Sequence, residues 1–438
     1  MTSLHPAPVA PTMLVCERCG HEWPEDALHA VCGDCGGLLE ARHATSASAG
    51  ALRAIFGARN PIVGGRDASS VSGVWRYREL VLPSIAAEAI VSHPEGNTPL
   101  IARRSVAEWA GAHTLLLKHE GHNPTGSFKD RGMTVAVTQA RRLGAAAVAC
   151  ASTGNTSASL AAYAAHADMR ALVFVPAGQI ALGKLTQTLA YGATTLLVRG
   201  DFDTCLALVR DSSAQLGVYL VNSINPFRLE GQKTIVLELL QQLDWTAPDW
   251  IALPAGNLGN TSAFGKALRE ARALGLIDRV PRLAVIQAAG AAPFAQAFDE
   301  GFSTRLHVKA ETVATAIRIG APASWDRAVR AVRDTNGVAL AVTDDEILEA
   351  KAVIDASGVG CEPASAASVA GVRRLVASGV IRPQERVVAV LTGHVLKDPG
   401  ILTRYHQEMQ PPPARANRPI EIEADLAAVE RVLRSNNA

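Results

Sequence analysis

The 438-residue sequence contains no run of 18 or more apolar residues, so no transmembrane helix is expected. Its formal net charge is +1, which gives no electrostatic basis for binding nucleic acid or a membrane surface. The amino-terminal residues lack a basic stretch followed by a long apolar core, which is the pattern of a signal peptide. Seven cysteines, an odd number, argue against a secreted disulfide framework, and we expect a cytoplasmic protein.

Lysine is also scarce: there are eight lysines, so 34 of the 42 basic residues are arginine. One of them, Lys129, lies in the polar turn HNPTGSFKDRG (122–132), directly before an apolar stretch with helical spacing (133–143). A cation at a helix start opposes the helix dipole, so the position requires an explanation. The residues leave two alternatives, a surface ion pair with Asp130 or a buried amine of lowered pKa that forms a Schiff base.

Four of the cysteines follow the spacing C-x2-C-x12-C-x2-C, at Cys16, Cys19, Cys32 and Cys35. Each pair lies in a glycine-containing turn, which allows two thiolates to bind one metal ion. Four soft ligands in tetrahedral order favour zinc, and a fully occupied ligand set indicates a structural rather than a catalytic site. The alternative is four unliganded thiols in a flexible leader.

From about residue 90, short apolar runs alternate with helical patterns. The runs are residues 145–152, 171–178, 194–198, 250–256, 282–288 and 386–393. This alternation predicts an α/β protein with mainly parallel sheets. Ligands of such proteins bind where the carboxyl ends of strands meet the amino ends of helices.

Two turns between a predicted strand and a predicted helix resemble anion sites. Residues 152–156, Ser-Thr-Gly-Asn-Thr, offer hydroxyls and amides suited to a carboxylate, or they cap the helix in the ordinary way. Residues 256–260, Gly-Asn-Leu-Gly-Asn, suit a phosphate, or they form a plain glycine-rich turn. The second turn matches neither a Walker loop nor G-x-G-x-x-G, so a nucleotide is not supported.

Two further turns carry polar residues at the end of an apolar run. Asn222 and Ser223 precede Arg228, which offers a bidentate fork for a phosphate or carboxylate, or which is a solvated surface arginine. Thr392 and Gly393 end the last apolar run, where the hydroxyl also suits capping of the next turn. A reactive lysine combined with a separate phosphate turn indicates pyridoxal phosphate, without excluding the ion-pair alternative for Lys129.

Eight stretches resemble the motifs of the threonine synthase family of fold-type II pyridoxal phosphate enzymes, and they occur in the family's order. They are GNTPL (96–100), HEGHNPTGSFKDRG, STGNTSAS, NSINPFRLEGQK, PAGNLGN, TAIRIGAPASW (315–325), EPASAASVAG (362–371) and LTGHVLKDP. Together they extend from residue 96 to residue 399. A single motif would be weak support, whereas eight in order are specific.

The resemblance implies roles for individual residues. Lys129 is the expected Schiff-base lysine and catalytic residue, with Phe128 as its neighbour. The other expected cofactor-binding residues are Asn155 (ring hydroxyl), Gly256, Asn257, Leu258, Gly259 and Asn260 (phosphate), and Thr392 (pyridine nitrogen). The expected substrate-binding residues are Ser152, Thr153 and Thr156 for the carboxylate, and Asn222, Ser223 and Arg228 for the phosphate. Lys184 also matches the family, with no role assigned.

The resemblance further implies a fold with two open, parallel-type sheets in a large and a small domain. We expect a disordered tail at 1–13, a zinc-ribbon-like segment at 14–44, and a cofactor-dependent catalytic region at 45–408. A small domain is expected as an insertion at about 124–221, and residues 409–438 are expected to form a linker and a helix that packs on the body. The family is usually dimeric, so a homodimer is expected.

The implied reaction converts O-phospho-L-homoserine and water to L-threonine and phosphate, by γ-elimination and β-replacement. A paralogue that acts on another phosphorylated amino acid, such as O-phosphoserine with sulfite, is the first alternative. A serine/threonine ammonia-lyase or a cysteine synthase of the same fold is the second, and an inactive adaptor protein is a third. The sequence departs from the family at Leu258, Ala321 and Val395, where the family has alanine, asparagine and glycine.

Overall fold

The computed structural model describes residues 12–27, 30–59, 68–152, 154–177, 185–200 and 202–435, and it shows an α/β protein. The chain divides into two compact units, residues 1–397 and 398–438. Within the described ranges, no helix is long and apolar enough to cross a membrane.

A six-stranded sheet forms the centre of the first unit, with the order β12-β11-β10-β13-β5-β4. All neighbours are parallel except β4 and β5, which are antiparallel. The strands are β4 (Leu100–Ala102), β5 (Thr114–His119), β10 (Trp250–Pro254), β11 (Arg282–Ala288), β12 (Val338–Val342) and β13 (Arg386–Leu391).

Helices cover both faces of this sheet, which explains why its strands are continuous apolar runs. In β10, Trp250 and Ala252 pack on one side, while Ile251 and Leu253 pack on the other. The first side is covered by α4 (Arg104–Ala110), α14 (Asp344–Ala356) and α15 (Pro363–Ala377). The second is covered by α10 (Thr234–Gln242), α11 (Gly259–Ala273), α12 (Pro293–Asp299) and α13 (Trp325–Asp334).

A second, four-stranded sheet is wholly parallel and has the order β8-β7-β6-β9. Its strands are β6 (Ala147–Ala151), β7 (Ala171–Pro176), β8 (Thr194–Val198) and β9 (Val218–Leu220). It is covered by α5 (Lys129–Arg142) and α6 (Asn155–His166) on one face and by α8 (Phe202–Leu216) on the other, with α7 (Thr186–Ala190) beside them. The wholly parallel four-stranded sheet and the mainly parallel six-stranded sheet confirm the predicted fold class.

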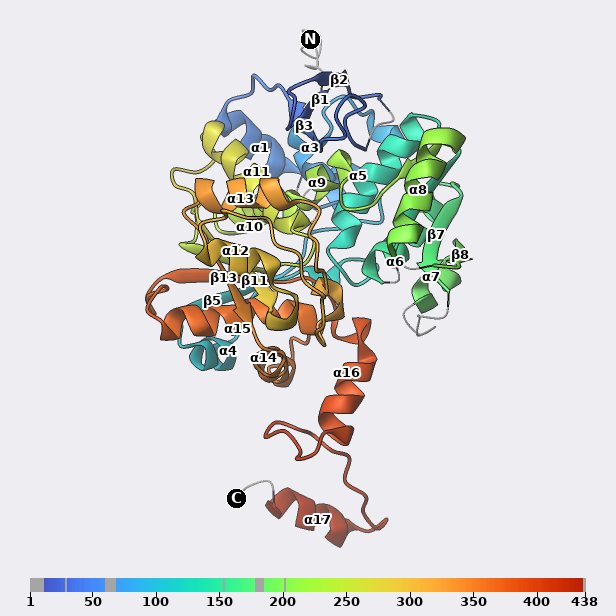
Figure 1. Cartoon of the computed structure of the whole chain (residues 1–438). Coiled ribbons are helices and arrows are strands. Elements are labelled where there is room, and N and C mark those ends of the chain that lie inside the picture. The colour runs from blue at the N-terminus through green and yellow to red at the C-terminus, as the bar shows by residue number, and fades with distance from the viewer. Residues whose placement is uncertain are drawn as a thin grey trace. The chain divides into compact units, whose positions relative to one another are not determined.

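The amino-terminal segment forms a small antiparallel sheet, β2-β1-β3. Its strands are β1 (Thr12–Cys16), β2 (Glu22–Pro24) and β3 (Leu39–His43), and the helices α1 (Ala49–Ala58), α2 (Ala68–Val71) and α3 (Arg78–Val81) follow it. Figure 1 shows this sheet beside α3 and α9 (Pro226–Gln232). Residues 12 and 13, which we expected in a disordered tail, belong to β1, and the rest of the expected tail, residues 1–11, lies outside the described residues.

Buried charges fasten the amino-terminal sheet to the rest of its unit. His43 of β3 lies 2.7 Å from the Glu230 carboxylate in α9, where Lys233 and Lys266 also pair with Glu230. Glu17 pairs with Arg327 of α13. These contacts join residues that are 187 and 310 positions apart in sequence. The segment is therefore an integral part of the first unit.

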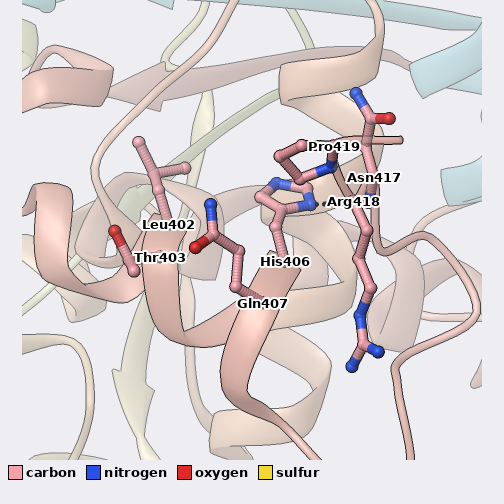
Figure 2. A pocket seen from close by; sticks show the side chains of 7 residues that line it. All are labelled: Leu402, Thr403, His406, Gln407, Asn417, Arg418 and Pro419. Atoms are coloured by element: carbon pink, nitrogen blue, oxygen red, sulfur yellow. Dashed lines mark hydrogen bonds between the residues drawn. The ribbon is translucent and has the colours of Figure 1, made fainter. Parts of the chain in front are cut away.

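The second unit contains α16 (Pro399–Thr403), a π-helical turn (Arg404–Glu408) and α17 (Leu426–Ser435). Figure 2 shows an open pocket formed by this unit alone, with His406 and Arg418 among the residues that line it. The Nδ1 atom of His406 accepts a hydrogen bond from the amide of Asn417 at 2.9 Å. None of the residues with a predicted role lies in this pocket.

Candidate active site

Lys129 is the first residue of α5, and the turn before it is fixed to the loop after β13. The Phe128 amide donates to the carbonyl of Thr392 at 3.0 Å, and Ser127 pairs with Gly393 in an isolated antiparallel bridge. The turn that carries Lys129 therefore contacts the turn at Thr392 and Gly393, although the two turns are more than 260 residues apart in the chain.

The surroundings of Lys129 favour a neutral amine. Its Nζ atom lies 4.0 Å from the centre of the Phe128 ring, a contact that by itself favours the charged amine. Burial and the positive charge of Arg228 lower the pKa of the Lys129 amine to about 7, whereas Glu362 opposes the shift. Asp130 accepts hydrogen bonds from the amide and hydroxyl of Thr125, at 2.7 and 2.6 Å, and makes no ion pair with Lys129. The structure therefore does not support the surface ion-pair alternative.

The turn between β6 and α6 presents Asn155 toward the site. Its Nδ2 atom donates to Oε2 of Glu362 at 2.9 Å. Ser152 accepts the amide of Gly154 at 3.3 Å, which is a local capping contact. Thr156 is half-buried, and its hydroxyl has no hydrogen-bond partner among the described residues. Thr153 lies outside the described residues, as does Lys184.

The turn between β10 and α11 leaves backbone donors free. Leu258 is the N-cap of α11 and has φ +62°, in the left-handed region. The first amide that bonds back in this helix is Ser262, to the carbonyl of Leu258 at 3.0 Å. The amides before it, at residues 259–261, therefore have no acceptor within the helix. The Oδ1 atom of Asn260 and the hydroxyl of Thr261 are buried without a hydrogen-bond partner.

These features fit an anionic group. Free amides and a hydroxyl donor at the positive end of a 15-residue helix favour a phosphate. Gly256 keeps the turn close to the loop at Ile317, because a Cβ atom on Gly256 would lie 2.8 Å from the Cα of Ile317. The plain-turn alternative leaves the buried hydroxyl of Thr261 without a partner, whereas a phosphate would accept its proton.

Arg228 in the first turn of α9 is buried and incompletely paired. It is 1 % exposed, which excludes the surface-arginine alternative. Its Nη1 atom donates to the carbonyl of Val221 at 3.0 Å, whereas Nε and Nη2 have no partner. Burial lowers the pKa of the guanidinium to about 10, so it is still charged at neutral pH. A buried charge with two free donors fits an anionic ligand.

Polar contacts connect this arginine with the neighbouring turns. Asn225 caps α9 by accepting the amides of Phe227 and Arg228, at 3.0 and 3.2 Å. Asn222 exchanges two hydrogen bonds with the backbone of Ala151, at 3.1 and 3.2 Å, and thereby joins β9 to the end of β6. Its side chain is thus already used for positioning.

One contact joins the two turns that fit a phosphate. The Nδ2 atom of Asn257 donates to the hydroxyl of Ser223, and its Oδ1 atom accepts the amide of Ala323 at 2.6 Å. The turn at 256–260 and the turn at 222–228 are therefore neighbours. The structure brings together Lys129, Asn155, Asn257, Ser223, Arg228 and Thr392, all of which were predicted from the sequence.

Thr392 follows β13 and belongs to a side-chain network rather than capping the next turn. Its hydroxyl donates to Oε1 of Glu362 at 3.1 Å and lies 3.0 Å from the hydroxyl of Ser365. Ser365 in turn accepts the amide of Gly393 at 3.0 Å.

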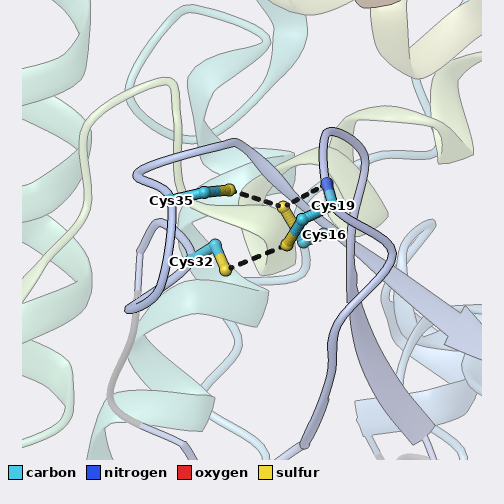
Figure 3. Close-up of side chains that lie close together, drawn as sticks. All are labelled: Cys16, Cys19, Cys32 and Cys35. Carbon is cyan, nitrogen blue, oxygen red and sulfur yellow. Dashed lines mark hydrogen bonds between the residues drawn. The ribbon is translucent and has the colours of Figure 1, made fainter.

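The four cysteines of the predicted zinc site gather in one cluster (Figure 3). Their sulfur atoms all lie within 4.8 Å of one another. The Sγ atom of Cys16 accepts the amides of Arg18 and Cys19 at 3.4 and 3.5 Å, contacts that stabilise a thiolate. Gly37 leaves room for the cluster, because a Cβ atom on Gly37 would lie 2.8 Å from Cys16 Sγ. The arrangement is compatible with a bound metal ion.

Comparison with known proteins assigns the family. Residues 91–393 match the model of the family described as pyridoxal-phosphate dependent enzymes. The threonine synthase of Methanosarcina acetivorans is 47% identical over 422 residues, which cover 96% of this chain and 98% of that protein. The threonine synthase of Methanocaldococcus jannaschii is 43% identical over 421 residues, with the same coverage. The chain belongs to the threonine synthase family.

The fold agrees with this assignment. The crystal structure of Escherichia coli threonine synthase superposes with a TM-score of 0.70 at 18% sequence identity, covering 97% of this chain and 100% of that one. Maize serine racemase superposes with a TM-score of 0.61 at 19% identity, covering 84% and 97%.

The three departures from the threonine synthase motifs have different surroundings. Leu258 is 1 % exposed and occupies a left-handed conformation, which is uncommon for a branched aliphatic residue. Val395 packs against Gly360, where a Cβ atom would lie 3.2 Å from the Val395 Cβ. Ala321 is exposed, and nothing in the structure explains why the family's asparagine is absent.

Sequence reasoning missed two charged residues of the site, Glu362 and Lys397. Glu362 occupies the N-cap position of α15, and its side chain accepts hydrogen bonds from both Asn155 and Thr392. Lys397 donates to Gln187 of α7, and burial lowers the pKa of its amine. Glu362 belongs to the motif EPASAASVAG and Lys397 to the motif LTGHVLKDP, two of the eight family motifs. Glu362 could have been noticed from the sequence, because it directly precedes a proline and a predicted helix rich in alanine, serine and glycine.

Proposed function

We propose that this chain is a threonine synthase, which converts O-phospho-L-homoserine and water to L-threonine and phosphate. The observation that supports this best is the pair of adjacent anion-binding turns beside Lys129. One is the amino end of α11, and the other is the buried arginine Arg228 with two free donors. Two phosphate positions suit an enzyme whose cofactor and substrate are both phosphorylated.

Pyridoxal phosphate fits the residues of the first position. The free amides at 259–261 and the hydroxyl of Thr261 would hold its phosphate, while Asn155 and Thr392 would meet its ring hydroxyl and ring nitrogen. When bound, the cofactor supplies an aldehyde for the lysine and an electron-withdrawing ring that acidifies the substrate. The remaining proposed contacts, Phe128, Gly256, Asn257, Leu258, Gly259 and Asn260, line the turns on which these groups lie.

Residues of the chain would accept the substrate Cα proton and bind the substrate phosphate and carboxylate. Lys129, with a pKa of about 7, is neutral in a large fraction of molecules at physiological pH and would take the proton from the substrate Cα atom. Arg228, with the Ser223 hydroxyl and the second Nδ2 proton of Asn222, would hold the substrate phosphate before and after the Cγ–O bond breaks. Ser152, Thr153 and Thr156 would bind the substrate carboxylate.

The alternative functions account for the features of this site less well. A serine/threonine ammonia-lyase has no substrate phosphate, so the buried, unpaired donors of Arg228 would have no function. An inactive adaptor does not require the half-buried Lys129 amine to lie near a charged arginine. A paralogue that acts on O-phosphoserine would use the same two anion positions, so only turnover distinguishes it.

The deciding experiment measures threonine and phosphate released from O-phosphohomoserine by the cofactor-loaded protein. O-phosphoserine, alone and with sulfite, is tested in parallel, and Lys129→Ala is the inactive control. Equal amounts of threonine and phosphate would support the proposal. Turnover of O-phosphoserine alone would replace it with the paralogue, and release of ammonia from serine or threonine would replace it with an ammonia-lyase.

We also propose that Cys16, Cys19, Cys32 and Cys35 bind one structural zinc ion, because four clustered thiolates are the ligand set that zinc prefers. A cytoplasmic homodimer is proposed from the cysteine usage and the family resemblance. Sedimentation of the purified protein tests the dimer.

A further inference from the structure

The amino-terminal sheet contacts two elements that border the second anion position, at Ser223 and Arg228. β3 is hydrogen-bonded to α9, and the turn after β1 is hydrogen-bonded to α13. α9 itself carries Arg228. The loop before α13 is bonded to Asn257, which in turn donates to Ser223. Two series of contacts therefore lead from one small sheet to the same position.

The first series passes through Glu230, two residues after Arg228 in α9. Residues two positions apart point to nearly opposite sides of a helix, so Glu230 faces away from the anion position that Arg228 borders. The Glu230 carboxylate accepts hydrogen bonds from His43 of β3 and from Lys266 of α11, each at 2.7 Å. His43 thus holds α9 from the side opposite to the anion position.

His43 has a fixed orientation. Burial raises the pKa of Glu230, but Lys233 and Lys266 lower it further, so this group is an ionised carboxylate that can only accept. The Nε2 atom of His43 therefore carries the proton that it donates to Glu230. Burial lowers the pKa of His43, although Glu230 opposes the shift, so the Nδ1 atom accepts the Thr12 hydroxyl at 2.8 Å. The ring is bonded to β1 on one side and to α9 on the other.

The second series starts beside the cysteine cluster. Glu17 directly follows Cys16, and its two carboxylate oxygens pair with Arg327 and Arg330 of α13. Arg327 is buried and also donates to the carbonyl of Leu39 in β3 at 2.6 Å. The first turns of α13 are therefore bonded both to the turn after β1 and to β3.

The loop before α13 continues this series. The amides of Ala323 and Ser324 donate to the side chain and to the carbonyl of Asn257, at 2.6 and 3.3 Å. The Nδ2 atom of Asn257 then donates to the Ser223 hydroxyl. Arg327 lies in the first turn of the helix that begins at this loop. A shift of α13 would therefore move Asn257 relative to Ser223.

We propose that the amino-terminal sheet sets the geometry of the second anion position, with His43 and Glu17 as positioning residues. His43 acts on Arg228 through α9. Glu17 acts on Ser223 through α13. Donors that are already in place bind an anion more tightly, because less ordering is required on binding. This role rests on the proposed function and deepens it, since it concerns how the site for the substrate phosphate is held.

The test measures the dissociation constant of inorganic phosphate by calorimetry. The holoenzyme is loaded with pyridoxal phosphate, so that the first anion position is occupied. His43→Leu and Glu17→Gln should each raise the constant about threefold or more, because coupling through packed elements is typically worth about 0.5–2 kcal/mol. The KM for O-phosphohomoserine should rise by the same factor, with kcat nearly unchanged. Arg228→Met should abolish phosphate binding, which identifies the position that is measured.

Two further variants separate positioning from a general effect on the sheet. In His43→Gln the side-chain amide can donate to Glu230 as Nε2 does, so the constant should return to the wild-type value. Arg42→Ala is the matched control, because Arg42 precedes His43 in β3 but its exposed side chain pairs with Glu40. It should leave the constant unchanged.

The outcomes separate this role from the proposed function. A wild-type constant in both His43→Leu and Glu17→Gln, with only the free energy of unfolding lowered, would show mere attachment and overturn the role. Phosphate that binds equally to wild type and Arg228→Met would instead overturn the second anion position, on which the proposed function rests. If His43→Leu does not fold, Glu17→Gln decides, because the Glu17 side chain is 13% exposed and tolerates the change better.

Discussion

Gly132 of α5 lies directly against Arg228 of α9. A Cβ atom at Gly132 would be 2.9 Å from the Arg228 carbonyl oxygen and 3.3 Å from both its Cβ and its Nε atoms. The glycine that ends the lysine motif therefore makes room for the arginine of another motif. Their contact links the position of the proposed Schiff-base lysine to that of the second anion site.

Gly132→Ala should displace Arg228. Alanine is ordinarily better than glycine inside a helix, by about 0.5–1 kcal/mol, but here the new methyl group meets backbone. We expect a lower free energy of unfolding and a KM for O-phosphohomoserine raised about tenfold or more. Gly57→Ala in α1 is the matched control, because no atom lies within 4 Å of a Cβ there. A normal KM in Gly132→Ala would show that Arg228 does not depend on this contact.

The pKa of Lys129 predicts a pH effect on the cofactor-free protein. The folded value, about 7, lies below the ordinary 10.5, so the unfolded chain binds more protons between these two pH values. Stability contributed by this residue should therefore rise with pH, by about 1 kcal/mol between pH 7.5 and 8.5. Urea unfolding of wild type and Lys129→Met at both pH values measures it, and other titrating groups cancel in the difference. An equal change in both proteins would contradict the lowered pKa.

Removing Glu230 should destabilise the first unit strongly. The buried carboxylate faces Lys233, Lys266 and His43, and their charges and hydrogen bonds hold its pKa far below the ordinary range. Glu230→Gln removes the carboxylate that pairs with His43 and leaves Lys233 and Lys266 with Glu270 alone, and breaking a buried ion pair costs about 3–5 kcal/mol. Denaturant unfolding measures this cost. Glu108→Gln breaks only the exposed pair with Arg104 and should leave the transition unchanged.

Cys16→Ser should release the proposed zinc. Purified wild-type protein is expected to contain one zinc ion per chain, and the variant well below one, because a serine hydroxyl is a poor ligand for this metal. Elemental analysis gives the stoichiometry. Cys205→Ser, at a buried cysteine outside the cluster, should keep the full content. Zinc retained in Cys16→Ser would remove this residue from the ligand set.

Much of the fold was predictable, and several residues of the candidate site could be proposed, because both depend on short stretches of sequence. A parallel strand buried on both faces must be a continuous apolar run, and residues 250–254 are such a run. The turn at 256–260 and the lysine at 129 likewise stand out through local composition. The strand boundaries were less certain: we expected 145–152 for a strand that covers 147–151.

Glu362 could not be assigned in this way, because its role depends on two distant partners. Asn155 lies 207 positions before it, and Thr392 lies 30 positions after it. Only the approach of the two sheets brings these side chains together. The burial of Arg228 could not be predicted either. An arginine in the first turn of a helix has the same local sequence whether its side chain is exposed to solvent or buried.

The attachment of the amino-terminal sheet determines the order of events during synthesis. His43 and Glu17 are made before their partners, because Glu230 and Arg327 follow them by 187 and 310 residues. Contacts of such separation form slowly, since a long chain must close first. The contacts that hold the amino-terminal sheet can therefore be completed only after α13, which carries Arg327, has been made.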